Sequence, residues 1–362
     1  MQRPAPLAAT LLVVFTAVMH CGCVKLGPKT VARDRFEYGT SIAESWKRQV
    51  LLNIVKFRYL DPPIFVDVGQ IVAGYSIEGT IGLGATESSD GTVQGDFFSL
   101  GAGGRYVDRP TITYTPLTGS RFVQGLMTPF RPEAVFAAIQ AGWPADAILF
   151  AAVASMNGLR NMEASVSKLS PAEPGFLRAL ELLRKLQQSG AVAFRIRKGE
   201  VDRPATIVTF RSSEIDAETF KDVAELRALL KLDPDASEIQ LVQGFAPSHR
   251  AELAVQTRSI LHIMASMAAE VDVPPEHVSE ERAWRGWTNL SESAPREPLI
   301  RIHATRDPPD DGYASVPYRD HWFWIDDRDL RSKRTFSLLM MLFTLTDTGE
   351  PGNLPLITIP AQ

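Results

Sequence analysis

The sequence predicts an α+β fold: an N-terminal helix, a glycine-rich β-hairpin or meander and further helices, then two units of helix–strand–strand–helix–strand order. Apolar residues recur at helical spacing after Ser41 and alternate with polar ones from Ile71 onwards, which is typical of a half-buried strand. The 362 residues are 45% hydrophobic and 22% charged, which fits a folded protein and excludes a disordered or polytopic membrane chain. The net charge of −4 gives no reason to expect nucleic acid as a partner.

The first 22 residues have the plan of a secretory signal peptide. Arg3 is the only charged residue before Lys25, and Leu7–Met19 is an uninterrupted run of apolar or small residues. A transmembrane helix needs about 20 apolar residues, so this run is too short to span a bilayer. We therefore expect residues 1–22 to be removed and residues 23–40 to form a tether.

The signal peptide is followed by the residues His20-Cys21-Gly22-Cys23. They resemble the lipobox of bacterial lipoproteins, in which a small residue precedes a cysteine that is acylated before cleavage. The family usually has leucine and a small residue where this chain has His20 and Cys21. The resemblance implies that Cys23 is lipidated, that the bilayer is a partner through its acyl chains, and that Val24 sorts the protein to the outer membrane, facing the periplasm. The alternative is an ordinary secreted protein with a chance cysteine.

The cysteine content then narrows the chemistry. Cleavage before Cys23 removes Cys21, and acylation converts the sulfur of Cys23 into a thioether. The mature chain would have no free thiol, so this processing excludes disulfides, cysteine zinc sites and a cysteine nucleophile.

An N-terminal α+β domain is predicted over residues 41–170, and it begins with a helix. Ser41 and Glu44 have capping-box spacing, and Asp61-Pro62-Pro63 is a stop signal. Between them runs one apolar stripe, which we interpret as a core face: Ile42, Trp46, Val50, Ile54 and Phe57. Further helices are expected between residues 120 and 161, with residues 145–156 buried on all sides.

Residues 64–116 are predicted to form the hairpin or meander. Odd positions from Ile71 to Leu83 are mostly apolar, residues 88–91 are typical of a turn, and residues 92–106 and 109–116 follow as strands. Glycine-rich strands pack weakly, so we expect this segment to be mobile or to pair with another chain at its edge. Insertion into a membrane is an alternative. Four acidic residues favour a soluble hairpin: Glu78, Glu87, Asp90 and Asp96.

The C-terminal half is predicted to contain two units of the same element order, over residues 171–246 and 247–362, with an insertion at 271–298. The first consists of a helix at 176–189, strands at 191–197 and 205–211, a helix at 216–231 and a strand at 238–244. The second consists of a helix at 248–270, strands at 299–305 and 315–325, a helix at 327–345 and a strand at 356–359. This order resembles the ring-building domains of bacterial secretion systems; an ordinary α+β fold is the alternative.

A search for catalytic motifs finds none that is complete. The glycines form no phosphate-binding loop, and there is neither a zinc-protease motif nor a serine nucleophile elbow. Ser165-x-x-Lys168 matches one motif of penicillin-recognising enzymes, but its companion motifs are missing, so we attribute it to chance. We therefore predict no catalytic residue, no metal ligand and no cofactor.

The candidate binding residues lie in two segments. Residues 303–329 are acidic and aromatic and include Asp307, Asp310, Asp311, His321, Trp322 and Trp324. Trp284 and Trp287 lie in the insertion and form either a recognition patch or, as we favour, a cover over the sheet. Alternatively, residues 303–329 have only a structural role, as a turn, a strand and a helix cap that uses Asp326 and Asp327.

Residues 45–67 and 322–343 resemble segments of predicted lipoproteins of Gram-negative bacteria, which supports the location alone. We predict a non-enzymatic, membrane-anchored, periplasm-facing scaffold or assembly component that associates with itself or with envelope proteins. The alternative is a periplasmic enzyme or glycan-binding module that uses residues 303–329.

Overall fold

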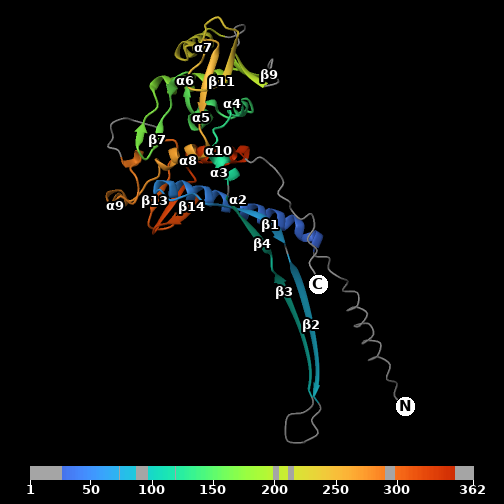
Figure 1. The fold of residues 1–362 in the computed structure, drawn as a ribbon. Coiled ribbons are helices and arrows are strands. Elements are labelled where there is room, and N and C mark those ends of the chain that lie inside the picture. The colour runs from blue at the N-terminus through green and yellow to red at the C-terminus, as the bar shows by residue number, and fades with distance from the viewer. Residues whose placement is uncertain are drawn as a thin grey trace, which may run out of the picture. The chain divides into compact units, whose positions relative to one another are not determined.

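The computed structural model describes residues 27–72, 74–86, 97–118, 120–198, 204–210, 216–289 and 298–346. It contains both helices and sheets, which confirms the α+β class (Figure 1). Cys23 and the predicted strand at 356–359 lie outside the described residues. The chain divides into two compact units: one takes Met1–Ser45 and Val66–Pro116, and the other takes Trp46–Phe65 and Leu117–Gln362.

Helix α2 (Gly27–Arg58) begins earlier than predicted, so most of the expected tether is helical. Pro28 stands in its first turn, where a missing backbone N–H costs little, and the capping-box spacing at Ser41 does not mark a helix start. The helix ends before Asp61, as predicted. Within the predicted stripe, Val50 and Ile54 are fully buried, whereas Ile42 is exposed, so its assignment to the core was wrong.

The first unit contains one long β-hairpin. Strands β2 (Tyr75–Thr86) and β3 (Phe97–Asp108) pair antiparallel at twelve consecutive positions without a shift in register. Strands β1 (Phe65–Val72) and β4 (Thr111–Leu117) form a second two-stranded sheet. The N–H of Arg109 donates to the carbonyl of Gly74 at 2.9 Å, between the two pairs. The segment is therefore a hairpin and not a meander, because its last strand pairs back with its first.

The second unit is built on a six-stranded sheet in the order β6-β5-β12-β11-β10-β9. Its strands are β5 (Val153–Met156), β6 (Leu159–Arg160), β9 (Val192–Lys198), β10 (Pro204–Phe210), β11 (Glu238–Gln243) and β12 (Glu252–Thr257). Its helices include α4 (Pro132–Gln140), α5 (Ala145–Ala152), α6 (Pro174–Ser189) and α7 (Ala217–Leu229). Helix α4 contacts β9, β11 and β12, and α6 contacts β6 and β9. The last four residues of the predicted 145–156 helix are strand β5.

The element order predicted for residues 171–246 is present as α6-β9-β10-α7-β11. Gly190 ends α6 at a φ of 69°, a left-handed conformation that glycine adopts readily. The predicted helix–strand–strand–helix–strand unit at 171–246 is nevertheless not a separate layer. Strand β12 pairs in parallel with β11, so the predicted boundary at 246/247 falls between two neighbouring strands of one sheet.

The prediction of a single helix at 248–270 was wrong. Residues Glu252–Thr257 form β12, and only Ile260–Ala268 form a helix, α8. Strand β12 lies between β5 and β11 and is mostly buried, so its apolar run resembles a buried helix in the sequence. Ser259 starts α8 by accepting a hydrogen bond from the His262 N–H at 3.2 Å.

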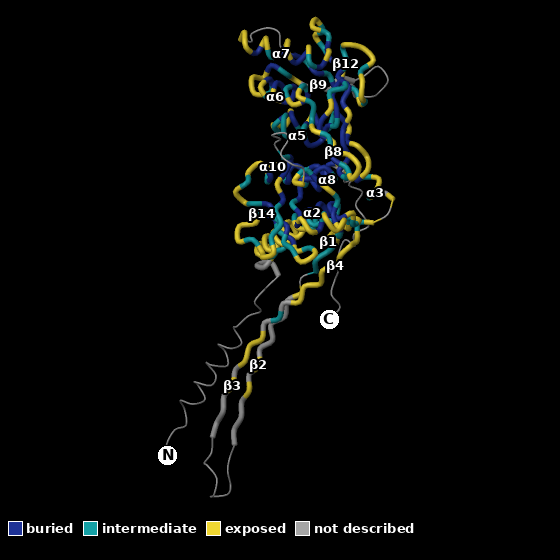
Figure 2. The backbone as a smooth tube through the Cα atoms, turned by 90° about the vertical axis from the view of Figure 1, so that its left-hand side faces the viewer, coloured by how far each residue is buried: buried dark blue, intermediate teal, exposed yellow. Residues whose placement is uncertain are grey.

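The remaining elements complete the second unit: α3 (Ser120–Met127), β7 (Glu163–Ser165), β8 (Lys168–Ser170), α9 (Pro275–Ser279), the 3-10 turn Trp287–Asn289 and α10 (Leu330–Thr346). Figure 2 shows buried residues gathered around α5 and α8. None of the described helices is both long enough and apolar enough to cross a membrane.

Arg258 is a buried cation that holds three segments of this core together. Its side chain is 1% exposed and donates to the carbonyls of Phe150 at 3.2 Å, Ala151 at 3.1 Å and Met162. Burial lowers the pKa of Arg258 to about 10. The side chain thus donates to carbonyls at the end of α5 and in the loop after β6, where the apolar core offers few other donors. The Phe150 carbonyl also accepts a hydrogen bond from Asn161 Nδ2 at 2.8 Å.

Replacing Arg258 by methionine should lower the free energy of unfolding by about 3 kcal/mol, because the carbonyls of Ala151 and Met162 lose the Arg258 donor while the side-chain volume changes little. Urea unfolding followed by circular dichroism measures this loss. Arg328→Met is the matched control, because the Arg328 side chain is 80% exposed and an exposed ion pair contributes about 0–1 kcal/mol. Equal losses in the two variants would contradict the role given to Arg258.

Candidate functional site

The candidate site lies on a three-stranded antiparallel sheet in the order β13-β15-β14. The strands are β13 (His303–Thr305), β14 (Gly312–Tyr318) and β15 (His321–Asp326), so the predicted strand at 315–325 is in fact a hairpin. Alternation along β15 places Phe323 and Ile325 in the core and leaves Trp322 and Trp324 half-buried on the other face. Trp324 is paired with His303 on one side and with Ser315 on the other.

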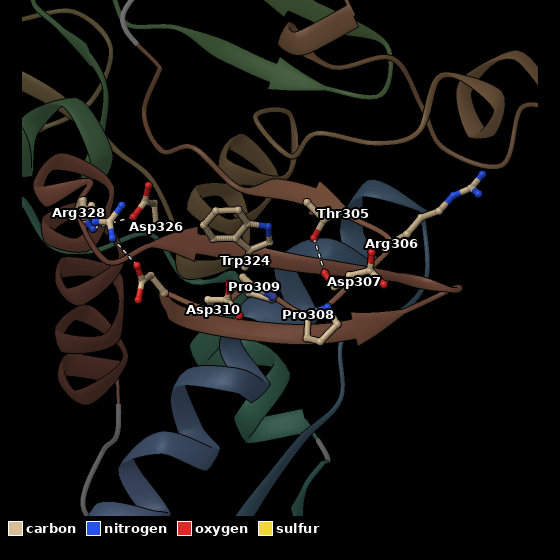
Figure 3. A pocket seen from close by; sticks show the side chains of 10 residues that line it. Thr305, Arg306, Asp307, Pro308, Pro309, Asp310, Trp324, Asp326 and Arg328 are labelled. Atoms are coloured by element: carbon tan, nitrogen blue, oxygen red, sulfur yellow. Dashed lines mark hydrogen bonds and ion pairs between the residues drawn. The ribbon is translucent and has the colours of Figure 1, made fainter.

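A cavity of about 410 Å³ opens on this second face (Figure 3). It is lined by Thr305, Arg306, Asp307, Pro308, Pro309, Asp310, Asp311, Trp324, Asp326 and Arg328. Four of the predicted site residues therefore come together: Asp307, Asp310, Asp311 and Trp324. The turn between β13 and β14 supplies three of them, and β15 supplies the tryptophan.

The charges in the cavity are only partly compensated. Arg328 forms an ion pair with Asp311, and its backbone N–H donates to Asp326 at 2.8 Å. The hydroxyl of Thr305 donates to the carbonyl of Asp307 at 2.8 Å, which closes the turn. Four aspartates face two arginines across the lining, so the cavity is acidic overall. It suits a ligand that offers several hydroxyl or amide donors.

Trp324 gives the cavity an aromatic wall. Its ring lies on the face of the sheet between Asp326 and Thr305 in Figure 3. The indole N–H is buried and has no hydrogen-bond partner, and the ring packs against His303 at a centroid distance of 4.9 Å. His303 is in turn hydrogen-bonded to Asp272 (Nδ1–Oδ2 3.4 Å), and this bond raises the pKa of His303.

The predicted helix cap uses a different aspartate. Helix α10 begins at Leu330, and Asp329 accepts hydrogen bonds from the N–H of Ser332 at 3.1 Å and from its hydroxyl at 2.7 Å. Asp327 instead forms an ion pair with Lys333 at 2.6 Å. The Asp326 carboxylate accepts from the Arg328 N–H and lines the cavity, and the Asp326 carbonyl accepts from the Asp329 N–H at 3.1 Å.

Trp284 and Trp287 lie apart from the cavity. Both are half-buried against the core, which supports the interpretation that they cover the fold. The indole N–H of Trp284 donates to the carbonyl of Phe57 at 2.9 Å, and its ring lies 4.9 Å from the guanidinium of Arg58. Between them, a side chain on Gly286 would come within 2.0 Å of Arg58, so this position requires glycine.

His321 joins a second cluster that sequence reasoning missed. The Tyr59 hydroxyl and His277 Nδ1 share a hydrogen bond of 2.7 Å, and the His277 and His321 rings lie 5.4 Å apart. Tyr318 hydrogen-bonds to Asp61, which also pairs with Arg319 at 3.0 Å. These residues come from the segment after α2, from α9 and from the β14–β15 hairpin. No local pattern in the sequence could have indicated that they meet.

Neither a serine-hydrolase pair nor a group of metal ligands is found among the described residues. Ser165 and Lys168 are directly opposed beside the turn of the β7–β8 hairpin and do not lie on a helix. The Lys168 amine pairs with Glu163. Ser165 donates instead to the Lys168 carbonyl at 3.4 Å, so the pair lacks the arrangement of a serine hydrolase. Within the described part of the chain, no three histidine, cysteine or acidic side chains are grouped as metal ligands.

The two clusters should respond to acid with opposite sign. Burial lowers the pKa of His277, which is 4% exposed, so acidification favours the unfolded chain once the pH falls below about 6.5. The pKa of His303 is raised, so its protonation stabilises the folded chain at low pH and this contribution is lost as the pH rises. We expect His277→Gln to flatten the loss of unfolding free energy on acidification and His303→Gln to steepen it. Parallel pH curves for both variants and the parent, measured by urea unfolding, would contradict this assignment.

The chain matches no protein-family model, and comparisons with curated proteins and with solved structures find no significant match. The fold and the cavity are therefore the basis for proposing a function. Of the predicted site residues, Trp322 lies on the same sheet face as Trp324 but does not line the cavity, and His321 belongs to the Tyr59 cluster.

Proposed function

We propose that this protein is an envelope lipoprotein, anchored in the outer membrane through acylated Cys23 and facing the periplasm, that works as a non-enzymatic assembly component and associates with further copies of itself. The β2–β3 hairpin is the observation that carries the proposal. Its two strands form a two-stranded sheet, so among the described residues the outer edge of each strand has no neighbouring strand.

Such a hairpin needs a partner for two reasons. An isolated two-stranded sheet is marginally stable in water, and β2 and β3 contact no other described element extensively. Natural proteins also protect long strand edges with lysine, proline or bulges. Neither strand contains lysine or proline, and the register runs through twelve pairs without a bulge. Edges of this kind favour pairing with the same strands of another copy.

Shortening the hairpin should abolish self-association. Removal of residues 80–103 joins Gly79 to Gly104, which are register partners, and leaves a Gly-Gly turn between the opposed Glu78 and Arg105. Gly-Gly is favoured in two-residue hairpin loops, so the rest of the first unit keeps its pairing. Light scattering after gel filtration of the detergent-extracted lipoprotein should find an oligomer for the parent and a monomer for the shortened variant.

Trp324→Ala is the control for this experiment, because it changes the second unit and leaves both strand edges intact. It should run as the parent does. A monodisperse parent monomer at high concentration would contradict the proposal. An unchanged oligomer after shortening would place the contact elsewhere on the molecule.

A glycan-binding module is the second candidate function, and the cavity beside Trp324 is the observation that favours it. An aromatic wall presents a flat apolar surface to a sugar ring, while Asp307, Asp310 and Asp326 offer acceptors for its hydroxyls. A carbohydrate of the cell wall fits this chemistry and the periplasmic location.

Trp324→Ala should weaken sedimentation of the protein with purified peptidoglycan by roughly tenfold, because it removes the one aromatic side chain that lines the cavity. Phe220→Ala is the matched control, since Phe220 is an exposed aromatic on α7 that lies outside this sheet. Equal binding by the parent and both variants, or none by the parent, would remove the support for a glycan site.

A further inference from the structure

We propose that the β2–β3 hairpin contacts lipid: in the self-associated state, one face of the paired hairpins lies against bilayer acyl chains and the other faces water. This inference rests on the proposed self-association and specifies what the β2–β3 hairpin contacts in the oligomer.

The register divides the hairpin into two faces. Directly opposed residues of an antiparallel pair lie on the same face, so odd positions of β2 share a face with even positions of β3. The β2 positions of this apolar face are Tyr75, Ile77, Gly79, Ile81, Leu83 and Ala85. Its β3 positions from 98 to 106 are all apolar or glycine. Asp108 is the one charged residue of this face, and it stands at the end of the strand.

The other face carries two charged residues and mostly glycine, serine and threonine, with the apolar residues Phe97 and Val107 near its two ends. Glu78 is directly opposed to Arg105 in the register, so both charged positions lie on this face. Of the four acidic residues that favour a soluble hairpin, Glu78 therefore lies away from the apolar face. Glu87, Asp90 and Asp96 lie outside the described residues. Around this pair, Thr80, Gly82 and Gly103 are exposed to solvent. A face of small polar residues opposite an apolar face is the pattern of a strand between water and lipid.

The length of the apolar face fits the thickness of a bilayer. From Tyr75 to Ala85 it spans eleven residues of β2. A strand of about 9–11 residues tilted by about 45° crosses the hydrocarbon core. Aromatic residues stand near both ends of the band, Tyr75 and Tyr106 at one end and Phe98 at the other, as is usual where strands leave lipid for water.

Lipid contact also requires that the backbone groups at both strand edges find hydrogen-bond partners. Inside a bilayer each backbone N–H and C=O needs a protein partner, so a single hairpin cannot insert. Edge-to-edge pairing with neighbouring copies supplies those partners and leaves no strand edge in lipid. Pairing of several copies within lipid thus explains both the unprotected edges and the apolar face. A protein layer over the apolar face would not explain the unprotected edges.

Single cysteines test the proposal, because acylation consumes the only thiol expected in the mature parent, which serves as the blank. Ala85→Cys and Ala102→Cys probe the apolar face, and Thr80→Cys and Ser99→Cys probe the other with similarly small changes. Each lipidated variant is labelled with an environment-sensitive fluorophore and reconstituted in phosphatidylethanolamine–phosphatidylglycerol vesicles with or without nitroxide-labelled lipid.

Nitroxide lipid should quench the fluorophore roughly twofold at positions 85 and 102 and leave positions 80 and 99 unchanged. Two variants on each face keep the test decisive if one substitution prevents assembly. Oligomers whose labels are not quenched at either apolar position would overturn lipid contact and leave self-association standing. They would indicate a protein layer over this face. Monomers in every preparation would overturn both proposals.

Discussion

A two-stranded sheet leaves the outward backbone donors and acceptors of both strands without strand partners. The proposals for the hairpin depend on this constraint. Along β2 and β3 it extends over twelve pairs with no bulge, proline or lysine to interrupt it. Water can satisfy those groups, but an unprotected edge of this length is also a template for another strand. The proposed self-association rests on these backbone groups, and the proposed lipid contact rests on them together with the apolar face of the hairpin.

The second unit solves a different problem, which is how to keep polar groups inside a large core. Arg258 donates to three carbonyls, and Asn157 bonds to the carbonyl of Leu230 at 2.7 Å and to the N–H of Ala254 at 2.6 Å. These contacts join segments that are far apart in the sequence. They tie loops beside the six-stranded sheet to neighbouring elements.

Local patterns predicted the parts of the fold that depend on local physics. Gly190 marks the end of α6, Asp61 follows the end of α2, and the alternation at Ile71–Leu83 lies in strands β1 and β2. Strand β12 was missed because a strand buried inside a sheet loses its alternation and resembles a helix. The long N-terminal part of α2 was missed because the cap signal at Ser41 has no effect within a continuing helix.

The candidate site was predictable only where its residues are close in the sequence. Asp307, Asp310 and Asp311 belong to one turn, and Trp324 lies on the adjacent strand, so the local sequence could single out these residues as candidates. Tyr59 and His277 are 218 positions apart and are joined only by tertiary packing. A single sequence carries no signal for such a pair.

Amide hydrogen exchange of the detergent-extracted protein, resolved by residue across β2 and β3, tests the proposed self-association most directly. If hairpins of several copies pair edge to edge, consecutive amides along both strands will be protected, because each N–H has a partner on one side or the other. If the hairpin remains alone, only alternate amides, those bonded between β2 and β3, will be protected. That second pattern would contradict the account.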